Sequence, residues 1–136
     1  MSDVLTGADL VRAFENHEID NRSFHHAEHV EVAFGLLTKY DFIDASATYA
    51  KGIRALATMA GAPTKFNVTI TYAFMSLIAE RMAIGQPRSF EDFARENPDL
   101  MSKHVLSQWY RTERLMSDAA RSVFLMPEPV SHSTVA

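Results

Sequence analysis

The stretch KFNVTITYAFMSLIAERMA, residues 65–83, decides the fold class of this chain. Its beginning, residues 68–71, alternates apolar and polar side chains in the way a half-buried β-strand does. The remainder keeps helical spacing, and no second strand exists elsewhere in the sequence to pair with it. We therefore expect residues 65–83 to form the most buried helix of an all-α protein. The apolar residues that follow the helical spacing are Phe66, Ile70, Ala73, Phe74, Leu77 and Ile78.

Helix-start and helix-stop signals extend this prediction along the chain. The breakers GAPT at residues 61–64 and GQP at residues 85–87 bound the central helix. Further helices are expected at about residues 6–16, 24–40, 45–60, 89–96, 99–110 and 113–123. The sequence predicts a single domain over residues 1–126, a compact bundle of about five to six helices, followed by a flexible tail at residues 127–136.

Composition narrows the chemistry that a chain of 136 residues can perform. The 13 basic and 17 acidic side chains give a net charge of −4, which offers no positive field to nucleic acid or to an anionic membrane surface. The N-terminal sequence lacks a secretory pattern, and no stretch approaches the roughly 18 apolar residues of a membrane span, so we expect a cytoplasmic protein. The absence of cysteine removes disulfides, thiolate nucleophiles and iron–sulfur ligation. The side chains that could take part in catalysis are therefore histidine, carboxylate, lysine, arginine, tyrosine and hydroxyl groups.

Histidines crowd near the start of the chain. Four of the six lie between positions 17 and 29, and three of these fall in the first turns of the helix expected at residues 24–40. At about 100° per residue, His25, His26 and His29 share the side of that helix that carries its apolar residues. Imidazoles directed into a protein interior need partners there. The alternative is that one or two of them cap the helix or bind a buried carbonyl.

His25 and His29 are the favoured reactive pair. Their i, i+4 spacing brings both rings to one side of a helix, where they can bind one metal ion or transfer a proton. The string HHAEH differs from the HExxH zinc motif, because Glu28 stands one residue too late for that motif's general base. We therefore expect His25 and His29 to be catalytic acid–base residues that use no cofactor. A divalent metal bound by the same pair is the alternative.

Polar side chains opposite this pair are candidates for substrate binding. Asn67 and Thr71 lie one turn apart on the apolar side of their helix, so they would present an amide and a hydroxyl to the core. The alternative is that Asn67 caps the helix and Thr71 bonds back to its own backbone. Lys65, at the helix start, is placed to neutralise a carboxylate or sulfate group. Arg54 and Tyr110 complete the expected substrate-binding residues.

Several motifs together point to a family. They are FHHAEH (24–29), GIR (52–54), KFNVTIT (65–71), SFEDF (89–93), NP (97–98), YRTERL (110–115) and AR (120–121). In this order they resemble a family of small, largely uncharacterised bacterial helical proteins, and the likeness spans residues 14–127. The resemblance implies an all-helical fold, and some proteins of this general kind belong to specialised-metabolite pathways.

One position departs from the family pattern. The family's second motif reads K-Y-H-x-T-x-T, with histidine where this chain has Asn67. If the family site uses His25, His29 and this third position as metal ligands, an amide is a poor substitute for imidazole on zinc or iron. The resemblance then leaves two readings, which are metal-free acid–base chemistry or a specialised subunit that relies on a homologous chain.

The leading hypothesis is a lyase-type enzyme that acts on a polar, anionic metabolite in a pocket between the helices expected at residues 24–40 and 65–83. An elimination suits the available residues, since it needs a positioned base and a stabilised leaving group but no thiol or phosphate loop. The alternatives are a divalent-metal enzyme and a non-catalytic partner of a homologous chain in a homo- or hetero-dimer.

Overall fold

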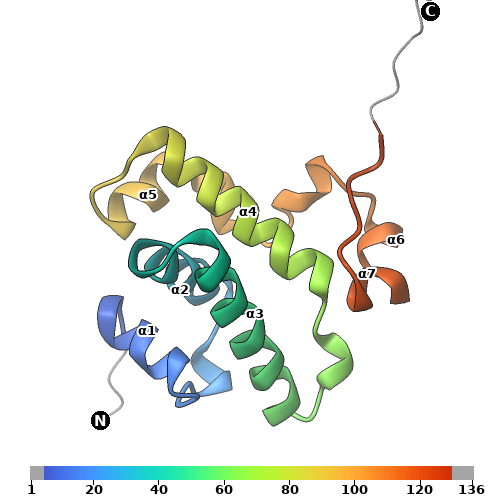
Figure 1. Cartoon of the computed structure of the whole chain (residues 1–136), viewed down its shortest axis with the longest axis horizontal. Coiled ribbons are helices and arrows are strands. Elements are labelled where there is room, and N and C mark those ends of the chain that lie inside the picture. The colour runs from blue at the N-terminus through green and yellow to red at the C-terminus, as the bar shows by residue number, and fades with distance from the viewer. Residues whose placement is uncertain (1–4, 130–136) are drawn as a thin grey trace, which may run out of the picture.

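The computed structural model describes residues 5–129 of the chain. Within them every regular element is a helix, which confirms the predicted all-α bundle (Figure 1). The α-helices of this part are α1 (Gly7–Glu15), α2 (His26–Lys39), α3 (Phe42–Met59), α4 (Val68–Gly85), α5 (Phe90–Glu96), α6 (Thr112–Leu115) and α7 (Asp118–Ser122). Its 3₁₀ helices are η1 (Asn21–Ser23), η2 (Pro63–Lys65), η3 (Pro98–Met101) and η4 (Val105–Gln108).

Residues 68–71, which alternate like a strand, form the first turn of α4. Asn67 caps this turn, with its side-chain oxygen accepting the Ile70 N–H at 2.9 Å. The Thr71 hydroxyl donates to the Asn67 carbonyl at 2.7 Å, so these two residues are bonded within the turn. Gln86 ends the helix in the left-handed conformation, at φ 47°. The prediction of helix rather than strand is confirmed.

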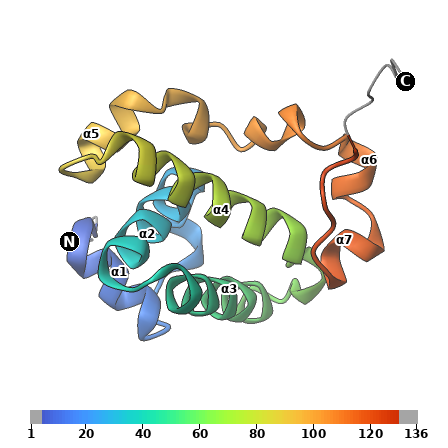
Figure 2. The same ribbon diagram turned by 45° about the horizontal axis from the view of Figure 1, so that its top comes forward.

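Helix α4 is the central element of the bundle. It packs against α2, α3 and α7, and Figure 2 shows it running across α2 and α3. Met75 and Ile78 are each only 1% exposed, which marks α4 as a core helix. Within the described residues it is also the one helix long and apolar enough to cross a membrane by length and composition alone. This corrects the expectation that no stretch of the sequence approaches that length.

Helix α1 approaches its neighbours closely at two glycines. A Cβ added to Gly52 of α3 would lie 2.3 Å from the Phe14 ring, and one added to Gly35 of α2 would lie 2.4 Å from Val11. Because Gly52 has no side chain, the Phe14 ring fits against α3 and stacks on Tyr49, with ring centroids 5.9 Å apart. The packing of Phe14 therefore restricts the position of the Tyr49 ring.

The chain beyond α5 differs from the two helices expected at residues 99–110 and 113–123. The first is replaced by η3 and η4, which are separated at Ser102, whose hydroxyl accepts the His104 N–H. The second is divided into α6 and α7, because Ser117 caps a new helix by accepting a backbone N–H in the first turn of α7.

An extended segment after α7 returns along the start of α4. The Thr69 hydroxyl donates to the Val123 carbonyl at 2.8 Å and accepts the Leu125 N–H at 3.0 Å. The Tyr110 hydroxyl donates to the Leu125 carbonyl at 2.8 Å. Of the tail expected at residues 127–136, the last seven residues lie outside the described part of the chain.

Candidate functional site

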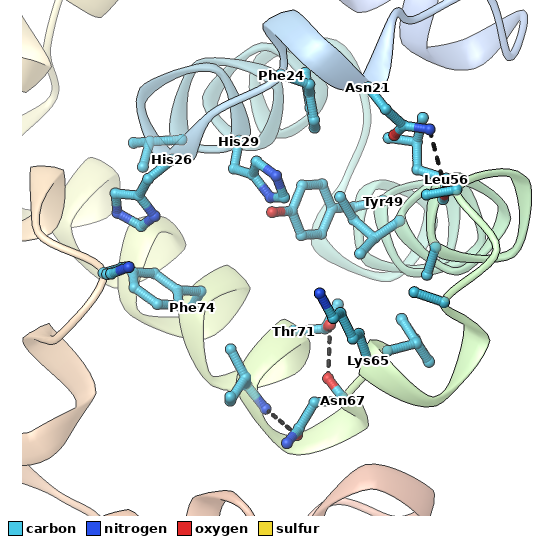
Figure 3. Close-up of a pocket in the computed structure, with 18 of the residues that line it drawn as sticks. Asn21, Phe24, His26, His29, Tyr49, Leu56, Lys65, Asn67, Thr71 and Phe74 are labelled. Atoms are coloured by element: carbon cyan, nitrogen blue, oxygen red, sulfur yellow. Dashed lines mark hydrogen bonds between the residues drawn. The ribbon is translucent and has the colours of Figure 1, made fainter.

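A cavity of about 700 Å³ opens between α2, α3 and α4 (Figure 3). Most of its wall is apolar and includes Phe24, Ile53 and Phe74. The polar side chains that line it are Asn21, His26, His29, Tyr49, Lys65, Asn67, Thr71, Lys103 and His104. The cavity lies between the two helices where the sequence predicts a pocket, but its wall is more apolar than a wholly polar substrate requires.

His29 extends from α2 into the cavity (Figure 3). Its ring packs against Phe24, with centroids 4.4 Å apart. Burial, together with the neighbouring His26, lowers the pKa of His29 to about 4. The imidazole is therefore neutral at pH 7, and each of its ring nitrogens is free of hydrogen bonds to the groups of residues 5–129. A neutral imidazole in this position can accept a proton.

Tyr49 is a cavity residue that the sequence prediction missed. It is 5% exposed, and its hydroxyl points toward His29 in Figure 3. No group within residues 5–129 hydrogen-bonds this hydroxyl, and burial raises its pKa, so the phenol keeps its proton. A signal for it exists in the sequence, because Tyr49, Ile53 and Leu56 recur at helical spacing and all three line the cavity.

The other two histidines of the cluster have structural partners. His26 lies in the cavity wall, where its Nε2 donates to the Leu100 carbonyl oxygen at 2.9 Å and its ring edge meets Phe74. His25 caps α2, and its ring is 74% exposed beside the Glu28 carboxylate. His25 does not line the cavity, so the structure brings His29 together with Tyr49 rather than with His25.

Asn67 and Thr71 do line the cavity, as expected, but their polar atoms have internal partners. The Asn67 amide donates to the Leu115 carbonyl at 2.7 Å, while its oxygen accepts the Ile70 N–H. The Thr71 hydroxyl donates to the Asn67 carbonyl (Figure 3). Both residues therefore have the helix-capping and back-bonding roles that the sequence left open as alternatives, and Thr71 keeps a lone pair toward the cavity.

The expected cationic residues separate in space. Lys65, in η2, is exposed at the rim and its side chain points into the cavity (Figure 3). Arg54 is exposed on α3 and does not line the cavity. Tyr110 is buried beneath the segment that follows α7 and also lies outside the cavity wall.

Lys103 and His104 add a second basic part to the rim. Both are exposed in the turn between η3 and η4, and both line the cavity. The neighbouring sequence could not assign either residue to the cavity. This turn reaches the rim because η3 packs against α2, which is a contact between distant parts of the chain.

No cluster of three or more histidine, aspartate or glutamate side chains within residues 5–129 is arranged to hold a metal ion. Comparison of the chain with protein-family models, with curated proteins and with solved structures gives no match. The features of the chain that bear on function are therefore the cavity and the two polar groups, His29 and Tyr49, that face it.

Proposed function

We propose that this protein is a small-molecule enzyme of the lyase type, in which His29 removes a proton from a substrate bound in the cavity. The observation that carries the proposal is the pairing of His29 with Tyr49. Both side chains face the cavity, and neither has a hydrogen-bond partner within residues 5–129. Their arrangement supplies a base and an acid on one wall of a site large enough for a metabolite.

The energetics of burial support this choice of residues. A buried polar group without a partner costs about 1–3 kcal/mol, so folded proteins satisfy such groups. His26, Asn67 and Thr71 obey this rule through bonds to backbone groups. The imidazole of His29 and the hydroxyl of Tyr49 are instead open to the cavity, where a ligand or water is the remaining partner. Within residues 5–129 the side-chain atom that is fully buried without a partner is Ser46 Oγ, which does not line the cavity.

The low pKa of His29 limits the substrate protons that it can remove to relatively acidic ones. A base whose pKa is about 4 is unprotonated at neutral pH but weak, so the C–H bond that it breaks must be acidified. A carbonyl group beside that carbon provides this acidity. In an elimination the C–H electrons form the new double bond, and the bond to the leaving group breaks.

Tyr49 can stabilise the negative charge that develops in this step. Because burial keeps the phenol protonated, its hydroxyl can donate to the oxygen on which negative charge develops, either the carbonyl or the leaving group. The substrate proton moves to His29, and the oxygen on which charge develops accepts a hydrogen bond from Tyr49, which keeps its own proton. The proton on His29 then passes to the departing group, which returns the imidazole to its neutral form.

The test measures the conversion of small carbonyl compounds that carry a leaving group on the β-carbon, next to the carbon that loses its proton. NMR in D₂O records both double-bond formation and exchange of the C–H proton. The purified protein should convert at least one compound, His29→Gln should be slower by about 10²–10⁴-fold, and Tyr49→Phe by about a hundredfold. His17→Asn serves as the matched control, since His17 is exposed and asparagine tolerates its positive φ of 58°.

Melting temperatures measured on the same samples separate chemistry from folding. A His29→Gln variant that turns over at the rate of the unaltered protein would contradict the proposal. Loss of turnover in His25→Gln with His29→Gln still active would assign the reaction to the other member of the histidine pair predicted from the sequence.

A further inference from the structure

We propose that the cavity selects an amphiphilic carboxylate, with its apolar body against the inner wall and its carboxylate at Lys65 and Lys103. This assignment deepens the proposed function by naming the substrate class of the same cavity. It is a statement about binding, so it can be tested without turnover.

The inner wall favours an apolar body. Aromatic and aliphatic side chains form most of the lining. They include Val30 of α2, Leu56 of α3, Phe74 of α4 and Phe24, which follows η1. A volume of about 700 Å³ falls within the range of sites that enclose small organic ligands. A sugar or another ligand polar on every side would lose hydrogen bonds to water here without recovering them from the wall.

The rim favours a negative charge. Lys65 reaches it from η2 and Lys103 from the turn after η3, two segments that are far apart in the sequence. No aspartate or glutamate of residues 5–129 lines the cavity, although the whole chain has 17 acidic and 13 basic residues. The rim is therefore positive on a protein whose net charge is −4, and it attracts an anion while repelling an amine.

The donors at the rim suit a monoanion better than a phosphate. No arginine of the described residues lines the cavity, so the fork that binds phosphate oxygens in pairs is missing. The Ile70 N–H, in the first turn of α4, is already bonded to Asn67. Lys65 and Lys103 each supply a point charge at the rim. The single negative charge of a carboxylate needs no more than such charges, without a paired set of donors.

The experiment compares four ligands with the same apolar chain, namely octanoate, octanol, octylamine and octyl phosphate. Affinities come from calorimetry or from NMR titration of the full chain. Octanoate should bind about tenfold more tightly than octanol and more tightly still than octylamine. Lys65→Met and Lys103→Met should each weaken octanoate about threefold, and together about tenfold, while octanol is unaffected. Lys51→Met is the matched control, because Lys51 is exposed on α3 outside the cavity.

The possible outcomes separate the ligand assignment from the proposed lyase function. Equal affinities for octanoate and octanol, an unweakened double variant, tighter binding of octyl phosphate, or no saturable binding of any of the four ligands would each overturn the assignment. Selective octanoate binding by a protein whose His29→Gln variant retains full turnover would overturn the proposed lyase function and leave the ligand class standing. Weakening of octanoate by higher salt, with octanol unchanged, would further support the charged rim.

Discussion

His25, His26 and His29 lie within little more than one helical turn, and each has a different environment. The His25 ring is in solvent, the His26 ring is bonded to a backbone carbonyl, and the His29 ring faces the cavity. Only the last combines burial with an absence of partners inside the described residues. For an imidazole, therefore, reactivity depends on what surrounds the ring more than on the residues beside it in sequence.

The depressed pKa of His29 predicts a pH-dependent stability. In the unfolded chain this residue titrates near its ordinary value of 6.5, whereas in the folded protein its pKa is about 4. Between these values the unfolded state binds a proton that the folded state does not, so stability is lost as the pH falls from 6.5 toward 4. The contribution amounts to about 2–3 kcal/mol, to be measured by urea unfolding across this interval.

Replacement of the imidazole isolates this contribution from other groups that titrate in acid. The His29→Gln variant should lose less stability between pH 6.5 and 4 than the unaltered protein. An identical pH dependence in His29→Gln and the unaltered protein would mean that His29 is accessible and protonates freely in the folded state.

The inward placement of both His29 and Tyr49 could be predicted from helical spacing, but the role of Tyr49 as a cavity residue could not. The helical wheel puts residue 29 inward, and the structure agrees. It fails for His25 because α2 begins at His26, so His25 has the extended backbone of an N-cap, with ψ −176°, and leaves the 100° spacing. Tyr49 was missed because a tyrosine on an alanine-rich helix is indistinguishable by pattern from a core aromatic residue.

At the scale of elements, local signals predicted the three helices that begin at strong caps, although α3 begins three residues earlier and α4 three residues later than expected. Asn67, Asp41 and Ser89 accept backbone N–H groups at the starts of α4, α3 and α5. The region after α5 has no comparable apolar periodicity, and its conformation depends on long-range bonds such as that between Thr69 and Val123. Contacts between residues so far apart in sequence leave no local pattern, so Lys103 and His104 could not be assigned to the rim.

The close contact between α1 and α3 predicts that position 52 accommodates no residue with a side chain larger than that of glycine. A Cβ there would meet the Phe14 ring at 2.3 Å, closer than side-chain atoms approach. Gly52→Ala should therefore destabilise the protein by about 1–3 kcal/mol, even though alanine is the better helix former. Because Phe14 supports Tyr49, ligand binding in the cavity should weaken as well. Urea unfolding and octanoate titration measure the two effects.

Two further variants establish the cause. Gly85→Ala is the matched control, since a Cβ there meets only Glu96 at an ordinary 3.6 Å. The double variant Gly52→Ala with Phe14→Leu should be less destabilised than the sum of its single changes, because a smaller residue 14 relieves the clash. Strict additivity would show that the two residues do not interact in this way.

At the scale of the whole molecule, the cavity is assembled by one chain. Helices α2, α3 and α4 provide the wall, η2 and the turn after η3 provide the rim, and Met116 adds a contact from the segment after α6. Segments from residue 21 to residue 116 must therefore pack together before the site exists. Binding at this site should consequently report on the folding of most of the bundle.

This completeness predicts that a single chain binds ligand without a homologous partner. The isolated protein should bind one octanoate per 15.3 kDa chain, with an affinity independent of protein concentration. Trp109, the single tryptophan, is 41% exposed, so its fluorescence reports any association that covers it. Sedimentation run beside the titration gives the mass of the binding species. Binding that requires a dimer, or one ligand per two chains, would favour the alternative that this chain acts as part of a two-subunit assembly, because a site complete in one chain gains nothing from the second.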